Sequence, residues 1–361
     1  MTFALLVLPV PSGRLDKDYG LKMAIRWGIV GAGKISNDFV NAFNSYPGKG
    51  KDNVMYAIAA RNPENAKKFA KTHNIQRIFN SYLEMAKSQD IDIAYIGTLN
   101  PQHYELARLF LENGKHVLVE KPLSLNSKQV KSLISLARSK KLFLMEAIWS
   151  RCLPSFIALE KEINSGKLGD VLFVEANFGI PITMVERVRK RDLGGGALLD
   201  IGLYVLQFAQ FVFKEEPIKV VSSGELNEEG MDLAATIILE YSGGRRAVLT
   251  ANGRLQLDNR ATVYGTKGRV TLKDPFHCSI EMINSEGKTE RFPLHDSDLP
   301  YYFVNSAALV YEALEVGRCI KNGLLESPRM SHNDSLSLAK LEDTIRQQLG
   351  VHYDVDDLEY P

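Results

Sequence analysis

The first 146 residues alternate between strand-like and helix-like patterns, and this alternation constrains the fold more than any other feature. The predicted strands are 26–31, 54–60, 91–98, 116–120 and 142–146, and the predicted helices are 34–45, 63–73, 101–113 and 127–140. Such alternation is typical of βαβ units around a parallel sheet. We therefore expect residues 23–146 to form a doubly wound α/β domain.

After Trp149 the rhythm changes, and strands follow one another without helices between them. The expected elements are helices at 154–165 and 198–213, strands at 170–178, 231–241, 245–253, 260–265, 268–273, 278–283 and 288–292, and closing helices at 301–322 and 333–349. Turn signals such as Gly243-Gly244 separate the strands. We expect residues 147–361 to form an α+β domain around one large, mainly antiparallel sheet.

Composition narrows the function classes. The 361 residues are 45% hydrophobic and 24% charged, with a formal net charge of +1. This balance is typical of a soluble globular protein and gives no field that would attract nucleic acid or anionic lipid. We therefore expect neither a nucleic-acid nor a membrane partner.

The cysteines and the N-terminus bear on the compartment. Cys152, Cys278 and Cys319 are far apart and lack metal-ligand spacing, so we expect reduced structural thiols, no metal site and a cytoplasmic location. Residues 3–8 are apolar, but no positive segment precedes them and Pro9 interrupts them, unlike a signal peptide. We expect residues 1–22 to be a disordered extension or the product of an upstream start codon.

A glycine turn follows the first predicted strand and opens the first helix. Its residues are Gly31-Ala32-Gly33-Lys34-Ile35-Ser36. Glycines at the start of a helix admit a pyrophosphate against the helix N-terminus, although a plain structural turn is the alternative. We predict a dinucleotide-binding domain, with Gly31, Gly33, Lys34 and Ile35 at the cofactor.

The next two strand ends carry further cofactor candidates. The second strand ends at Arg61 with no acid beside it, and an arginine there accommodates the 2′-phosphate of NADP, whereas an acid would bind the ribose of NAD. NADP is therefore preferred, with a solvated loop arginine as the alternative. Thr98 and Asn100 follow another strand on the same edge, and His103 is either a cofactor or substrate contact or a hydrogen-bonded helix-terminus histidine.

Two segments supply candidate catalytic groups. Glu120-Lys121-Pro122 places an ammonium at the carboxyl end of a buried strand, the edge where ligands bind in parallel sheets. Asp200, Tyr204 and Gln207 share one face of an otherwise apolar helix behind Gly194-Gly195-Gly196. That face either forms structural hydrogen bonds or meets a wet cleft.

If the Lys121 ammonium lay ~4 Å from the Tyr204 phenol, it would contribute about 4 kcal/mol at an effective dielectric constant of ~20. That energy would lower the pKa of the phenol by up to about three and make it a plausible base for an alcohol. Alternatively, Lys121 itself bonds the substrate oxygen while Asp200 fixes it.

Together the motifs G-A-G-K-I, A-A-R, T-L-N-P-Q-H, E-K-P, M-E-A-I-W-S-R and G-G-A-L-L-D-I-G-x-Y resemble the glucose-fructose oxidoreductase and inositol dehydrogenase (Gfo/Idh/MocA) family. The resemblance covers residues 24 to about 350 and is strongest to the dihydrodiol dehydrogenase branch, also described as NADP-linked D-xylose dehydrogenase. That branch often carries H-P-Q-H where this chain has Asn100-Pro101-Gln102-His103.

The resemblance implies a Rossmann domain, and an open-faced sheet for substrate binding and homodimerisation. It implies catalysis by Lys121 and Tyr204, supported by Asp200, and oxidation of a trans-dihydrodiol or an aldose with NADP. It also implies that Glu120 and Arg151 contact the cofactor and that Trp149 and Phe178 contact the substrate. The rival hypotheses are a dinucleotide-binding regulator without turnover and a reductase of another cyclic carbonyl compound.

Overall fold

The computed structural model describes residues 24–49 and 52–361, so the expectation for residues 1–22 falls outside the described residues. Six parallel strands form sheet A. Their spatial order is β3 (Arg77–Phe79), β2 (Asn53–Ala59), β1 (Ile25–Val30), β4 (Ile93–Ile96), β5 (His116–Glu120) and β6 (Leu144–Ala147). The predicted doubly wound parallel sheet is confirmed.

Some helices of this half begin at a residue whose side chain caps them. They are α1 (Lys34–Ser45), α2 (Pro63–His73), α3 (Tyr82–Lys87), α4 (His103–Glu112) and α5 (Ser127–Lys140). The side chains of Asn62 and Asn126 accept from backbone amides in the first turns of α2 and α5. The prediction missed β3 and α3 because elements of three and six residues are too short to show a period.

Eight strands form sheet B. Their spatial order is β14 (Thr289–Arg291), β13 (Glu281–Ile283), β12 (Gly268–Leu272), β11 (Ala261–Gly265), β7 (Val171–Gly179), β10 (Arg246–Asn252), β9 (Asp232–Glu240) and β8 (Lys219–Leu226). Neighbours are antiparallel except for β7 and β10, which run parallel. The predicted mainly antiparallel sheet is confirmed. The prediction missed β8 because half of this strand, Ser-Ser-Gly-Glu, is polar.

The helices of the second half are α6 (Pro154–Asn164), α7 (Glu186–Arg189), α8 (Leu203–Phe213), α9 (Val310–Lys321) and α10 (His332–Leu349). The prediction of a helix over 301–322 was wrong at its start. The Asp38 carboxylate accepts hydrogen bonds from the backbone amides of Tyr302 and Phe303, which holds that segment against α1 instead. A 3-10 turn, η7 (Ser306–Leu309), then leads into α9.

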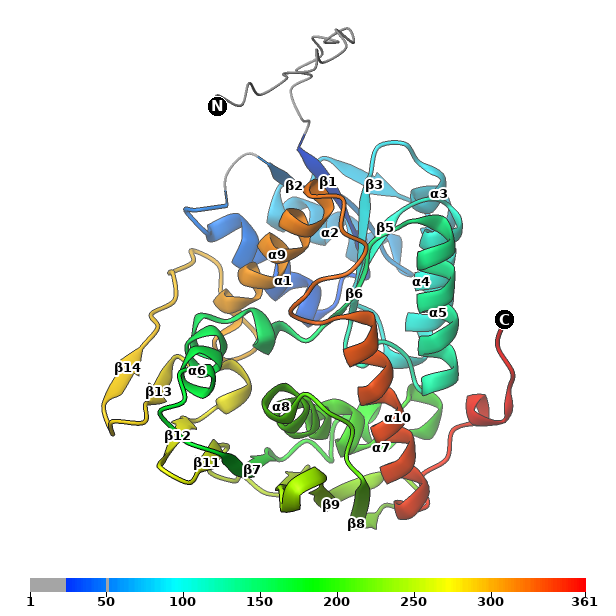
Figure 1. The fold of residues 1–361 in the computed structure, drawn as a ribbon. Helices are drawn as coiled ribbons and strands as arrows, with labels where there is room; N and C mark the ends of the chain where they lie inside the picture. Colours follow the sequence, from blue (N-terminus) through cyan, green and yellow to red (C-terminus); the bar gives the residue numbers. More distant parts are fainter. Residues whose placement is uncertain (1–23, 50–51) are drawn as a thin grey trace, which may run out of the picture.

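The closing helices return to the first half of the chain. α9 packs on α1 and α10 packs on α5, while α8 packs on β7 and β10 of sheet B (Figure 1). The main hydrophobic core is continuous from Trp27 and Tyr95 near sheet A to Phe208 and Leu249 near sheet B. The division at residues 146 and 147 therefore remains a prediction, because packing crosses it.

One described segment, Arg191–Phe213, is long and apolar enough to cross a membrane by length and composition. However, 83% of its apolar window is buried inside the protein. Its apolar side chains are accounted for by the core between the two sheets.

Candidate functional site

The carboxyl ends of the sheet A strands bring the predicted residues to one edge. The strand order reverses between β1 and β4, and ligands bind at such a switch point in open α/β sheets. The glycine turn follows β1, Thr98 follows β4, and Lys121 follows β5.

The glycine turn has the conformation that a dinucleotide requires. Gly31 has φ +97°, and a Cβ there would lie 3.0 Å from the Thr98 Cγ2 and 3.1 Å from the Gly97 carbonyl oxygen. Gly33 precedes α1 without a side-chain hydrogen bond to the first turn of this 12-residue helix. The exposed helix N-terminus therefore retains backbone N–H groups for an anion.

Thr98 and Asn100 lie beside this turn, in different roles. The Thr98 Oγ1 is buried and has no hydrogen-bond partner within the described chain, so it suits a polar group of a bound dinucleotide. The Asn100 Nδ2 donates to the Gly194 carbonyl oxygen at 3.1 Å. Thr98 thus fits the predicted cofactor role, whereas Asn100 ties the two halves of the chain together.

His103 takes the structural role that the sequence left as an alternative. Its ring nitrogens lie 2.7 Å from the Pro122 carbonyl oxygen and 3.3 Å from that of Thr98. Burial lowers its pKa, so the ring is neutral and donates from Nδ1 to Pro122. His103 braces the strand-end loop that carries Lys121.

The basic cofactor candidates lie at the rim. Arg61 is exposed two residues after β2, and Ala59 at the end of that strand accepts a hydrogen bond from the Gly31 N–H at 2.9 Å. The Lys34 Nζ lies 5.6 Å from the centroid of the Tyr302 ring, and Ile35 is half-buried. Arg61 is therefore a neighbour of the glycine turn.

Lys121 and Asp200 meet at the centre of the site, although they come from opposite halves of the chain. The Lys121 Nζ donates to the Asp200 backbone oxygen at 2.6 Å and to its carboxylate Oδ1 at 3.2 Å. Arg187, on α7, donates to the same Oδ1 at 2.8 Å. Burial alone would raise the pKa of the Asp200 carboxyl, but Lys121 and Arg187 hold it at about 2. Asp200 is thus ionised at neutral pH.

A π-helical turn, η4 (Leu198–Gly202), carries Asp200 and leads directly into α8 with Tyr204. Such turns widen a helix locally and occur frequently at functional sites. The Lys121 Nζ lies 5.4 Å from the centroid of the Tyr204 ring, and the Tyr204 hydroxyl accepts a hydrogen bond from the Trp149 Nε1 at 2.9 Å. Lysine and tyrosine therefore share the site, but the ammonium faces the ring.

The expectation that Lys121 lowers the pKa of Tyr204 is wrong. Burial raises the pKa of this phenol well above its usual value, and the charge on Glu120 raises it further. An ammonium ~4 Å from the phenol oxygen would act against the cost of desolvating a tyrosinate, and in this buried site the desolvation cost dominates. Tyr204 is a protonated phenol at neutral pH.

Aromatic side chains surround the Tyr204 ring. Phe178 is stacked on His277 at a centroid distance of 4.4 Å, and His277 lies 4.8 Å from Tyr204. Burial and the nearby Lys121 lower the pKa of His277 to about 3, so its ring is neutral. The His277 Nδ1 is buried without a partner in the described residues, which leaves one polar atom within an aromatic cluster.

Sequence reasoning missed His277 and Arg187. A single histidine in Phe276-His277-Cys278 gives no spacing signal, and Arg187 is one of several basic residues around α7. Their roles follow from contacts made across the fold.

Glu120, which precedes Lys121 in the chain, is one of two buried acids that influence each other; the other is Glu312. The Tyr95 hydroxyl donates to the Glu120 Oε1 at 2.7 Å, and burial raises the pKa of Glu120. Glu312, on α9, is fully buried, and burial and the charge of Glu120 raise its pKa well above the usual range. Glu120 is therefore bonded to Tyr95, and its predicted cofactor contact stays a prediction.

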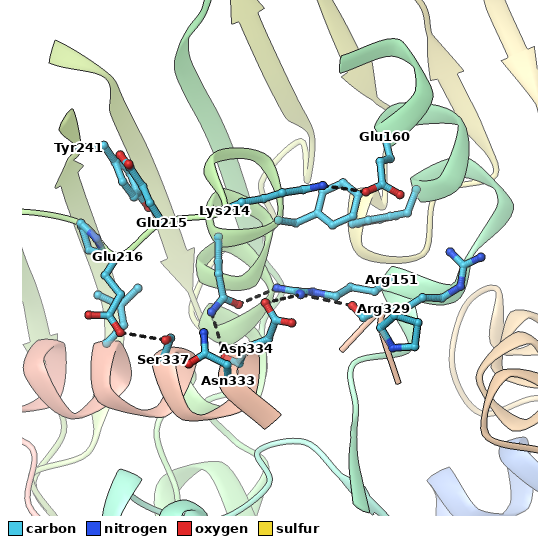
Figure 2. A pocket seen from close by; sticks show the side chains of 16 residues that line it. Arg151, Glu160, Lys214, Glu215, Glu216, Tyr241, Arg329, Asn333, Asp334 and Ser337 are labelled. Atoms are coloured by element: carbon cyan, nitrogen blue, oxygen red, sulfur yellow. Dashed lines mark hydrogen bonds and ion pairs between the residues drawn. The ribbon is translucent and has the colours of Figure 1, made fainter. Parts of the chain in front are cut away.

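Arg151 does not have the contacts expected of a cofactor residue. It donates to the Gln207 Oε1 at 3.1 Å and the Gln210 Oε1 at 2.6 Å, and it pairs with Asp334 at 3.1 Å. Figure 2 shows Arg151 and Asp334 in the lining of a separate pocket between α6, α8 and α10. Arg151 is therefore no longer a candidate cofactor residue. Of the polar residues that share one face of the predicted helix, Gln207 forms structural hydrogen bonds, which was one of the two alternatives.

No group of three or more His, Cys, Asp or Glu side chains that could hold a metal is found in the described part of the chain. The three cysteines are buried free thiols. The chemistry available at the site is that of Lys121, Asp200, Tyr204 and the aromatic side chains beside them.

Two family models match the chain. Residues 25–148 match the model described as "Oxidoreductase family, NAD-binding Rossmann fold", and residues 156–271 match the GFO/IDH/MocA C-terminal domain. The trans-1,2-dihydrobenzene-1,2-diol dehydrogenase of Xenopus tropicalis is 44% identical over 92% of this chain and 100% of its own length. The human protein of that name is 40% identical over 92% of this chain and 99% of its own.

Solved structures show the same fold. A levoglucosan dehydrogenase in complex with NADH and levoglucosan aligns with a TM-score of 0.79 at 19% identity, over 91% of this chain and 97% of that one. A 3-ketoreductase from Actinomadura kijaniata in complex with NADP aligns with a TM-score of 0.74 at 25% identity, over 90% and 98%. With both domain models matched and 44% identity to a full-length relative, the chain belongs to the Gfo/Idh/MocA family of oxidoreductases with an NAD(P)-binding Rossmann domain.

Proposed function

We propose that this protein is an NADP-dependent dehydrogenase that oxidises a hydroxyl-bearing carbon of a trans-dihydrodiol, with aldoses such as D-xylose as secondary substrates. The observation that carries the proposal is the meeting of Lys121, Asp200 and Tyr204 at the edge of sheet A that also carries the glycine turn. Relatives of 40–44% identity that bear the dihydrodiol dehydrogenase name support the substrate class.

The cofactor preference rests on the end of β2. Gly31, the α1 N-terminus and the buried Thr98 hydroxyl fit a dinucleotide, and Arg61 is the exposed cation next to them. The nearby acid Glu64 is already paired with Lys67 at 2.8 Å. An arginine without a competing free carboxylate favours a 2′-phosphate.

The acid–base roles follow from the charges. When bound, the nicotinamide accepts a hydride from the substrate carbon. Tyr204 exchanges a proton with the substrate oxygen. The phenol must be ionised to accept this proton during oxidation and protonated to donate it during reduction. The Lys121 ammonium, fixed by Asp200, stabilises negative charge on that oxygen. Trp149 orients the Tyr204 hydroxyl.

The aromatic cluster favours a flat ring over a sugar. Phe178, His277 and Trp149 surround Tyr204 with ring faces and edges. Apolar ring faces suit the unsaturated carbons of a dihydrodiol, and oxidation of that substrate gives a ketone that tautomerises to a catechol.

The rivals are weaker. A regulator without turnover needs neither the fixed ammonium nor the buried phenol. Reduction of another cyclic carbonyl compound is supported by the likeness to a 3-ketoreductase, and the same proton donor would serve it.

We also propose a cytoplasmic location, which the three free thiols support, and a homodimer formed through sheet B. On the sheet face away from α8, Val221 pairs with Ile238, which pairs with Val248. Val221 and Ile238 are exposed large apolar side chains of this row. An apolar row on an open sheet suits a second copy of the chain.

Turnover of trans-dihydrodiols is the direct test. We expect NADP reduction, followed by absorbance, to be faster with trans-1,2-dihydrobenzene-1,2-diol than with D-xylose or D-glucose. The Tyr204→Phe variant should lose about 10²- to 10⁴-fold in kcat while retaining NADP binding, because only the proton carrier is removed. Tyr241→Phe, at a buried tyrosine outside the site, is the control. Undiminished turnover in Tyr204→Phe would exclude Tyr204 from the mechanism.

Arg61 tests the cofactor preference. Removing a charge-assisted hydrogen bond costs about 1.5–3 kcal/mol, so Arg61→Ala should weaken NADP binding by about 10- to 100-fold and leave NAD binding nearly unchanged. Quenching of protein fluorescence by each dinucleotide measures both affinities. Arg108→Ala, at a half-buried arginine on α4 that pairs with Glu112, should change neither. Equal losses for NADP and NAD would refute the 2′-phosphate contact.

The pH profile tests the high pKa of Tyr204. Because its pKa lies above its usual value of about 10, ionisation of the phenol grows throughout the neutral and alkaline range. The rate of oxidation should therefore increase from about pH 6 to about pH 9. Reduction of a cyclitol ketone uses the protonated phenol, so it should not require the higher pH. His277 and Asp200, with pKa values of about 3 and about 2, do not titrate there. An oxidation rate that levels off by about pH 7 would contradict this assignment.

Sedimentation equilibrium tests the homodimer. A charge at the centre of the apolar row should oppose association, so Ile238→Asp should convert a dimer into a monomer at micromolar concentration. Met184→Asp changes an exposed methionine elsewhere and should leave the dimer intact. A wild-type protein that sediments only as a monomer would exclude the proposal.

A further inference from the structure

A small hydrophobic cluster, separate from the main core, lies next to the lysine–aspartate pair. Its members are Leu125, Leu199, Met231, Val351 and Tyr353. Leu125 follows Lys121 by four residues, and Leu199 directly precedes Asp200. Two residues beyond α10 therefore pack against both segments that carry the proposed catalytic charges.

Tyr353 connects this cluster to a second glycine turn, Gly194-Gly195-Gly196, which precedes η4. Its hydroxyl donates to the Gly195 carbonyl oxygen, and its side chain is 2% exposed. The turn is closely packed, since a Cβ at Gly195 would lie 2.5 Å from the Val188 oxygen, and it requires glycine at Gly194 and Gly196, which have φ +67° and +112°. A hydrogen bond to Gly195 thus acts on a backbone that enters η4 a few residues later.

β9 also holds the segment that follows this turn. The Asp232 carboxylate accepts a hydrogen bond from the Leu198 N–H at 2.6 Å, at the start of η4. Hydrogen bonds to Asp232 and Tyr353 therefore hold the chain at and just before the start of the π-helical turn. Asp200 lies two residues beyond Leu198.

Residues 351–360, which we call the C-terminal strap, are fastened to the Rossmann half. Asn126 donates to the Asp356 Oδ1 at 3.0 Å, and Gln129 donates to the Tyr360 hydroxyl at 2.9 Å. The buried Arg346 pairs with Asp356 at 2.7 Å and lies 4.7 Å from the centroid of the Tyr353 ring. The strap is thus bonded at α5, at the end of α10 and at the second glycine turn, Gly194-Gly195-Gly196.

We propose that the C-terminal strap sets the position of Asp200 relative to Lys121, and that Tyr353 is the positioning residue which transmits it. The proposal rests on the proposed function of that pair, because Tyr353 itself touches neither. Lys121 and Asp200 are carried by different halves of the chain. The strap contacts Leu125, four residues after Lys121, and the second glycine turn, which precedes Asp200. Without the hydroxyl, the buried Gly195 carbonyl oxygen lacks its donor and the turn relaxes.

The variant Tyr353→Phe tests this role, because it removes the hydroxyl and keeps the ring between Arg346 and Val351. We expect kcat for dihydrodiol oxidation to fall by about tenfold while KM for NADP stays within about twofold, since displacements near 1 Å suffice for such losses. Tyr104→Phe is the matched control. It removes a buried hydroxyl that bonds Ser132 at 3.0 Å on α4 and α5, and its kcat should match that of wild type.

Hydrogen–deuterium exchange provides a readout that needs no substrate. Peptides covering 194–204 and 118–126 should exchange faster in Tyr353→Phe than in wild type or Tyr104→Phe. If wild type turned over no diol or sugar, the proposed function would fail while this exchange difference still tested the strap. Unchanged exchange and kcat in Tyr353→Phe would overturn the positioning role, as would equal losses in both variants.

If Tyr353→Phe does not fold, Asp356→Asn replaces it. This change weakens the pairing with Arg346 and leaves the Tyr353 hydroxyl in place. It should accelerate exchange in the same two peptides and lower kcat by about two- to fivefold. Exchange confined to residues 351–360 would overturn the proposal.

Discussion

The contact between the Lys121 ammonium and Asp200 is the interaction on which the site depends. It joins the end of a parallel strand in sheet A to a π-helical turn packed on sheet B. Asp200 offers both its backbone oxygen and its carboxylate, so the lysine is fixed in direction as well as in charge. Arg187 shares the carboxylate and completes a cluster of two cations around one anion.

The residues around this contact divide the chemical tasks. Desolvation keeps Tyr204 protonated and His277 neutral, so the charges that meet at Asp200 are its own carboxylate and the cations of Lys121 and Arg187. In the proposed mechanism, the proton carrier (Tyr204) and the charge carrier (Lys121) are thus separate side chains. A buried phenol beside an ammonium can exchange a proton without a change in the charge that stabilises the oxyanion.

The sequence was sufficient where the information was local. Apolar strands and the glycine turn predicted sheet A except for β3, together with helices α1, α2 and α5. It was insufficient where long-range contacts determine the structure. Arg151 bonds Gln210 and Asp334, and Asp38 binds the backbone of residues 302 and 303, where a helix was expected. Burial raises the pKa of Tyr204, which was expected to be lowered. His277, Arg187 and Tyr353 could not be singled out, because each acts through a neighbour more than ten residues away in the chain.

The continuity of the core across the two family models has a consequence for how this protein comes apart. Tyr95 of β4 and Phe208 of α8 belong to one cluster of buried side chains, and α9 and α10 pack back onto the first half. The two sequence modules are therefore one cooperative unit in thermodynamic terms. A polypeptide severed after β6 would expose the apolar side chains that α9 and α10 cover, and it would be prone to aggregate.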